Sequence, residues 1–132
     1  MTPMKRTILL IEDNEQNIYL VTFLLEKHGY AVVTVADGPR GIEEARTLVP
    51  ALILLDIQLP RMDGYAVARA LRQYEALRGT PIIAVTSYAM PGDREKALAA
   101  GCTGYIEKPI NPDTFVAEIE RALRPAAPGG AP

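Results

Sequence analysis

The 132-residue chain has one cysteine, no tryptophan and no long apolar run. Cys102 has no partner for a disulfide or a cysteine-based metal cluster, so we predict a small buried apolar residue. No stretch approaches the roughly 20 apolar residues of a membrane span and no signal peptide is recognisable, so a cytoplasmic protein without a membrane anchor is expected. An excess of positive charge is also missing. Sixteen acids against 14 lysines and arginines give a net charge of −2, which argues against direct nucleic-acid binding.

The length of the chain predicts one domain with a real core, because a domain of this size buries about two-thirds of its unfolded surface. We place this domain at residues 1–124. The last eight residues, PAAPGGAP, have nothing to bury, so residues 125–132 are expected to form a disordered tail.

Aliphatic runs alternate with segments of helical periodicity along the whole domain. The expected strands are residues 7–11, 31–36, 52–56, 81–86 and 104–107. A helix is expected after each of them, which predicts an α/β fold, a three-layer sandwich with a parallel five-stranded sheet between two layers of helices. The pattern leaves two strand orders open, one Rossmann-like and one flavodoxin-like.

The inward faces of the helices follow from apolar residues three or four positions apart. We expect inward side chains at Ile42, Ala45, Leu48 and Val49 in the second helix, at Ala97, Leu98 and Ala100 in the fourth, and at Phe115, Ile119 and Leu123 in the fifth. Alanine buries little area, so at about 25 cal/mol per Å² the fourth helix should be weakly held and mobile. Asn111, followed by Pro112, is expected to cap the fifth helix.

Polar residues collect where the expected strands end. Asp56 follows the aliphatic run Leu-Ile-Leu-Leu, and turn residues come directly after it. Parallel strands end on one edge of a sheet, where ligands bind in open α/β folds, so these side chains should meet. The residues expected at this edge are Glu12 and Asp13, Asp56, Thr86 and Lys108.

Three carboxylates at one site repel one another, so a divalent cation is expected among them. Mg²⁺ fits, because it prefers oxygen ligands and is often bound by one or two carboxylates together with a phosphate. Asp13 and Asp56 would bind it directly and Glu12 through water. The charge of Lys108 and the hydroxyl of Thr86 suit a phosphoryl group, which makes Asp56 the expected nucleophile, forming an aspartyl phosphate that water later hydrolyses.

Each of these residues also has an ordinary explanation when it is taken alone. Glu12 and Asp13 could simply start a helix, Thr86 could be a β-branched strand residue, and Lys108 could be a solvated surface lysine. Their coincidence on one edge, in order, favours the phosphoryl site. His28 ends the first helix and is expected at the surface without a phosphohistidine role.

Four motifs in the required order carry a family resemblance: IEDN at 11–14, LDIQLPRMDG at 55–64, VTSYAM at 85–90 and YIEKPI at 105–110. With them the chain resembles the CheY-like response-regulator receiver domain of bacterial two-component signalling, over about residues 7–123. It is most similar to stand-alone receivers of the chemotaxis and cell-division-control kind.

This resemblance implies the flavodoxin-like strand order 2-1-3-4-5 and assigns roles by position. Asp56 matches the phosphoacceptor, and Glu12 and Asp13 match the metal-binding acids. Gln58 would bind Mg²⁺ through its backbone carbonyl. The remaining matches are Thr86 as the switch hydroxyl, Lys108 as the phosphate-pairing lysine in a cis Lys108–Pro109 peptide, and Tyr105 as an aromatic switch that could instead be plain core.

The resemblance also implies partners. A sensor histidine kinase or a histidine phosphotransfer protein would donate the phosphoryl group, and a downstream protein target would bind the face made by the fourth helix, fifth strand and fifth helix. The chain would be a monomer or a weak phosphorylation-dependent homodimer. It would catalyse only its own phosphorylation and dephosphorylation.

Three other classes fit less well. A haloacid-dehalogenase-like phosphatase would have a second Asp where this chain has Gln58, and its acids would not lie on the first strand. A flavin- or nucleotide-binding module would need a glycine-rich phosphate loop that the sequence lacks. A receiver that docks unphosphorylated would not need all five site residues.

Overall fold

A computed structural model describes residues 5–59, 62–87 and 90–124, so the expected tail at 125–132 lies outside the described residues. Five parallel strands form one sheet in the order β2-β1-β3-β4-β5, which confirms the flavodoxin-like arrangement. The strands are β1 (Thr7–Ile11), β2 (Ala31–Val35), β3 (Leu52–Asp56), β4 (Ile82–Thr86) and β5 (Gly104–Glu107).

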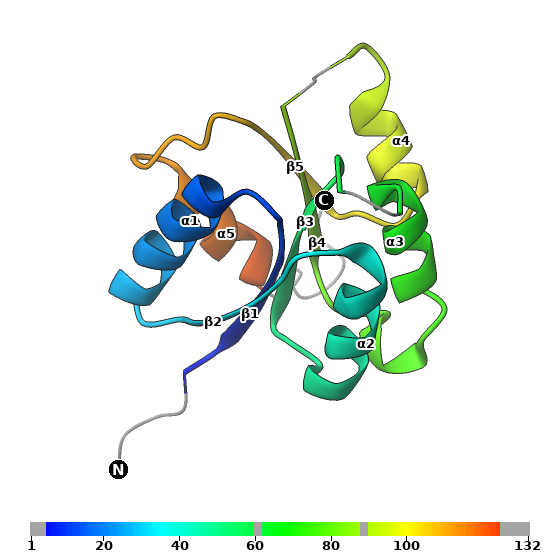
Figure 1. The fold of residues 1–132 in the computed structure, drawn as a ribbon, viewed down its shortest axis with the longest axis horizontal. Helices are drawn as coiled ribbons and strands as arrows, with labels where there is room; N and C mark the ends of the chain where they lie inside the picture. The colour runs from blue at the N-terminus through cyan, green and yellow to red at the C-terminus, as the bar shows by residue number, and fades with distance from the viewer. Residues whose placement is uncertain (1–4, 60–61, 88–89, 125–132) are drawn as a thin grey trace, which may run out of the picture.

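Helices cover both faces of the sheet (Figure 1). α1 and α5 lie on one face, and α2, α3 and α4 lie on the other. The helices are α1 (Glu15–Lys27), α2 (Gly38–Leu48), α3 (Gly64–Leu71), α4 (Asp93–Ala99) and α5 (Phe115–Leu123), with a short 3₁₀ helix, η1 (Glu75–Leu77), after α3. The central strands β3 and β4 are buried along their whole length, as their continuous aliphatic runs predicted.

Two of the expected inward side chains face solvent instead. Val49 and Leu98 are each 47% exposed. Val49 lies beyond the last helical residue of α2 and has a left-handed backbone (φ 43°), so helical periodicity no longer applies to it. Leu98 follows the buried Ala97 by one residue, and one step turns a side chain about 100° around the helix, away from the sheet.

The predicted start of α5 was three residues early. Asn111 does not cap the helix: its side chain accepts a hydrogen bond from the Asp113 N–H (2.9 Å) and stabilises a turn. The Asn111 carbonyl accepts from the N–H groups of Thr114 and Phe115, and the helix begins at Phe115. The polar sequence before α5 therefore serves a turn, as Asn often does. The expected mobility of α4 stays a prediction.

Candidate functional site

The strand ends bring the predicted site residues together. β1, β3 and β4 are neighbours in the sheet, and the residues at or just past their carboxyl ends are Glu12, Asp56 and Thr86. All three are buried, whereas Asp13 is exposed. One carboxylate oxygen from each of Glu12, Asp13 and Asp56 lies within 4.8 Å of the other two. The structure thus places the acids where the sequence placed them.

Lys108 reaches this cluster from the end of β5. Its Nζ lies 3.0 Å from Glu12 Oε1 and 3.4 Å from Asp56 Oδ2, and its side chain is nearly buried. The Lys108 N–H donates to the Thr86 carbonyl (2.7 Å), which ties the chain after β5 to the end of β4. The Lys108–Pro109 peptide is cis, as the family resemblance implied.

The site carries more negative than positive charge. Burial, followed by the hydrogen bond to Asp56, raises the pKa of Glu12 from its ordinary value to about 6 despite the opposing effect of Lys108. The backbone N–H groups of Asp13 and Asn14 donate to Glu12 Oε2 at 3.2 Å each. One lysine therefore faces three carboxylates, and a divalent cation with oxygen ligands would fit this donor set.

Gln58 has a part in the site that the sequence did not reveal. Its backbone N–H donates to Asp56 Oδ1 (2.9 Å). Its side-chain amide crosses to the next strand end, where Nε2 donates to Thr86 Oγ1 (2.9 Å) and Oε1 accepts from the Ser87 N–H (3.2 Å). The only signal available in the sequence was the position of Gln58, two residues after Asp56. The predicted role of its backbone carbonyl stays a prediction.

Tyr105 lies on β5, opposite Ala84 of β4. Its ring packs, partly buried, against the core between the sheet and the α2–α4 layer. Its hydroxyl is buried and has no hydrogen-bond partner among the residues described. Such an unpaired group costs free energy. The predicted role of Tyr105 as a switch stays a prediction.

His28 and Cys102, for which the sequence predicted no role in the site, lie away from it. His28 is exposed at the end of α1, where its Nδ1 is 2.9 Å from the Leu24 carbonyl. Cys102 is buried, and burial raises the pKa of its thiol to about 11, although Arg72 opposes the shift. Both predictions, a surface histidine and a small buried cysteine, are confirmed.

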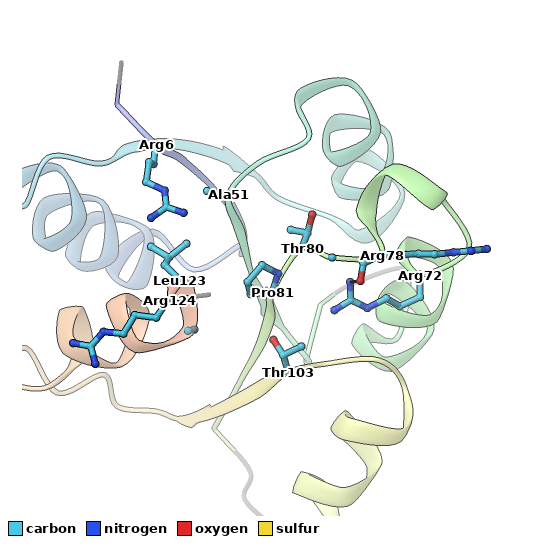
Figure 2. Close-up of a pocket in the computed structure, with 11 residues that line it drawn as sticks. Arg6, Ala51, Arg72, Arg78, Thr80, Pro81, Thr103, Leu123 and Arg124 are labelled. Carbon is cyan, nitrogen blue, oxygen red and sulfur yellow. Dashed lines mark hydrogen bonds between the residues drawn. The ribbon is translucent and has the colours of Figure 1, made fainter. Parts of the chain in front are cut away.

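A cavity of about 470 Å³ lies at the opposite edge of the sheet, and four arginines are among its lining residues (Figure 2). Arg72, one of them, donates from Nε to the Gly101 carbonyl (2.9 Å) and from Nη1 to the Leu77 carbonyl (2.6 Å). These bonds satisfy carbonyls at the carboxyl ends of helices, where cations are favourable. We therefore assign Arg72 to the structure of this edge and not to the candidate site.

The fold and the site together define a class of protein. It is a flavodoxin-like α/β domain with acids, a lysine and a hydroxyl gathered at the carboxyl ends of its parallel strands. The response regulator receiver domain matches residues 8–120, and the chain belongs to this family. It is accordingly a signalling domain of the two-component type and not a classical enzyme.

Individual relatives support this assignment. The polar-differentiation response regulator DivK of Brucella ovis is 41% identical over 120 residues, which cover 91% of this chain and 98% of that protein. A receiver domain of a sensor histidine kinase from Pseudomonas aeruginosa PAO1, solved with a magnesium ion coordinated in its active-site cleft, is 38% identical with a TM-score of 0.84. That match covers 91% of this chain and 98% of that one.

A third relative is a response regulator protein from Burkholderia multivorans, known from a solution structure. It is 39% identical with a TM-score of 0.77, over 94% of this chain and 99% of that one. Among the residues described here, no helix is long and apolar enough to cross a membrane.

Proposed function

We propose that this receiver domain accepts a phosphoryl group on Asp56 from a phosphohistidine of a sensor histidine kinase or a histidine phosphotransfer protein. The observation that supports it best is the position of Asp56, buried, 3.4 Å from Lys108 Nζ and grouped with two further acids. A buried carboxylate in such company is placed for chemistry more than for packing.

The transfer is a displacement at phosphorus. An oxygen of Asp56 attacks the phosphorus, the bond from phosphorus to the imidazole nitrogen breaks, and the electron pair of that bond stays on the nitrogen. The product is an acyl phosphate on Asp56. In the later hydrolysis, water attacks the same phosphorus, the bond from phosphorus to the Asp56 oxygen breaks, and inorganic phosphate and the free carboxylate are formed.

Lys108 and Thr86 hold the transferred group. The Lys108 ammonium already lies within 3.4 Å of Asp56, so it can pair with a phosphoryl oxygen after a small movement. The Thr86 hydroxyl, at the end of the neighbouring strand, would donate to a second oxygen. The backbone N–H of Gln58, which now donates to Asp56 Oδ1, offers a further donor at the same turn.

Magnesium is the metal that suits these oxygens. Asp13, Asp56 and the Gln58 carbonyl would hold it, and Glu12 would bind through a water molecule. When bound, the ion neutralises charge on the phosphoryl oxygens and on the attacking carboxylate.

The outer face of α1 is a suitable surface for the kinase partner. α1 begins directly after the acidic residues, and it carries two exposed rings, Tyr19 (75% exposed) and Phe23 (51% exposed). The rings stack with centroids 6.4 Å apart beside a cavity of about 410 Å³. An apolar patch at the rim of a polar site is typical of protein docking surfaces.

The output surface is the face made by α4, β5 and α5. α4 has only seven residues, and Ala97 is the one that it buries, so moving it disrupts little packing. Phosphorylation would shift a pre-existing equilibrium in this face, with Tyr105 as the switch residue, and so change binding of a downstream protein. A cytoplasmic location, a monomer or weak phosphorylation-dependent homodimer, and the absence of nucleic-acid binding stay predictions.

Intact mass after incubation with Mg²⁺ and acetyl phosphate tests the proposal. The parent should gain one phosphoryl group, Asp56→Asn should gain none, and Asp113→Asn, a matched change at an exposed acid, should behave like the parent. The same three proteins are then mixed with a phosphorylated histidine phosphotransfer domain. A parent that stays unmodified with both donors would overturn the proposal.

A further inference from the structure

The Gln58 side chain joins the phosphoacceptor turn to the neighbouring strand end through a pair of hydrogen bonds. Its amide uses a donor and an acceptor at once, toward Thr86 Oγ1 (2.9 Å) and from the Ser87 N–H (3.2 Å). Its own backbone N–H contacts Asp56 at 2.9 Å. One residue therefore contacts both the nucleophile and the proposed switch hydroxyl.

The two ends of this bridge differ in their surroundings. Thr86 is buried, whereas Gln58 is exposed. A released Gln58 amide would be hydrated, so breaking the bridge leaves no buried polar group unpaired on the glutamine side. Opening the bridge therefore costs little free energy, while its two hydrogen bonds still favour one arrangement of Thr86 and Ser87.

The bridge also lies at the carboxyl end of β4. The Thr86 carbonyl is held by the Lys108 N–H (2.7 Å), which fixes the backbone at the last residue of β4. Ser87, the next residue, is held by the Gln58 side chain through its N–H. The Gln58 amide thus restrains the first residue that lies beyond the strand, together with the Thr86 side chain.

We infer that Gln58 is a positioning residue that acts as a latch: its side chain holds Thr86 and Ser87 in the unphosphorylated arrangement and is displaced when a phosphoryl group on Asp56 attracts the Thr86 hydroxyl. The inference rests on the proposed function and adds a regulatory element to it. The latch contributes to the free-energy difference between the unphosphorylated and the phosphorylated arrangement. It therefore affects how strongly the site binds a phosphoryl group.

Beryllium fluoride in the presence of Mg²⁺, a mimic of a phosphoryl group on a carboxylate, provides the test. The variant Gln58→Met keeps the length of the side chain and removes both hydrogen bonds. It should bind beryllium fluoride more tightly than the parent, by about fivefold for each lost hydrogen bond of ordinary net strength. Gln73→Met, a matched change at an exposed glutamine for which the structure gives no side-chain hydrogen bond, should bind like the parent.

A second readout separates a latch from general loosening. In ligand-free Gln58→Met, the amide NMR signal of Ser87 should move toward its position in the beryllium fluoride complex of the parent. The effect of Gln58→Met on affinity should also shrink in a Thr86→Val background, because the hydroxyl that the latch holds is then missing. Mg²⁺ affinity is measured for each protein so that changes in metal binding can be separated.

The outcomes distinguish the latch from the proposed function. A parent that binds no beryllium fluoride and accepts no phosphoryl group contradicts the proposed function itself. A parent that does both, with Gln58→Met binding equally well or more weakly, contradicts the latch alone, and weaker binding would show that Gln58 supports the phosphorylated arrangement.

Discussion

Gly64 should be the most sensitive glycine of the site, because the turn after β3 passes directly over it. A Cβ added to Gly64 would lie 2.5 Å from the Ile57 Cα, 2.9 Å from the Ile57 oxygen and 3.0 Å from the Asp56 oxygen. All three are backbone atoms, so no side chain can turn aside to make room. In addition, the Gly64 N–H donates to the Ile57 carbonyl (3.1 Å) and closes the turn.

The size of the effect of Gly64→Ala follows from these distances. Carbon atoms in contact are ordinarily about 3.5–4.0 Å apart, so the backbone next to Asp56 has to move by roughly 1 Å. Overpacking of this kind costs about 1–3 kcal/mol in the free energy of unfolding, and a backbone clash belongs at the upper end. A displacement of about 1 Å at a reacting group can lower a rate about 100-fold.

Urea unfolding and the rate of phosphorylation by acetyl phosphate, followed by intact mass, measure both effects. Gly79→Ala is the matched control, because nothing lies within 4 Å of its added Cβ and its φ is ordinary. We expect that control to be neutral or slightly stabilising, by up to about 1 kcal/mol. If Gly64→Ala unfolds within about 0.5 kcal/mol of the parent and is phosphorylated at the same rate, the turn does not need a glycine and the reasoning fails.

Three further predictions concern other parts of the molecule. The double variant Tyr19→Ala, Phe23→Ala should accept a phosphoryl group from a kinase or phosphotransfer protein at least tenfold more slowly and react with acetyl phosphate at the rate of the parent. Equal slowing with both donors would place the defect in the site. Val49→Gly should raise the free energy of unfolding in urea by about 1 kcal/mol, because the φ of 43° at this exposed position strains a valine and not a glycine. A loss of stability would show that the contacts of the valine side chain matter more than the strain. Between pH 8 and pH 11 the parent should lose about 2 kcal/mol more in the free energy of unfolding than Cys102→Ala, because the thiol pKa is about 11 in the folded state against an ordinary 9.0 and the stability that this difference provides is lost as pH rises. Parallel pH profiles of the two proteins would contradict this.

The positions of the candidate site residues could be predicted from the sequence because the parallel topology of the sheet largely determines them. Polar residues that follow aliphatic runs must lie at one edge once the strands are parallel, which brought Glu12, Asp56 and Thr86 together without knowledge of the strand order. The order itself depends on which helices pack on which face, and periodicity does not contain that information. The family motifs supplied it, and the structure agrees.

The failures have a common physical origin. Val49 and Leu98 were assigned by helical spacing, which says nothing about the residue at which a helix ends or about how narrow its buried face is. Asn111 fits a helix cap and an Asx turn equally well on sequence grounds. The bridge from Gln58 to Thr86 depends on how two loops pass each other, a relation between residues 28 positions apart that no local pattern encodes.

The charges of the site explain why a metal and a phosphoryl group should bind in a linked way. Three carboxylates face one lysine, and burial, followed by Asp56, raises the pKa of Glu12 to about 6, which is consistent with a site that disfavours further negative charge. A phosphoryl group alone would add to that repulsion, whereas a divalent cation relieves it and then attracts the anion. We therefore expect each of the two to raise the affinity for the other by the same factor, since linkage is reciprocal. Because the deficit of positive charge lies beside Asp56, a bound metal ion would prepare the proposed nucleophile for attack.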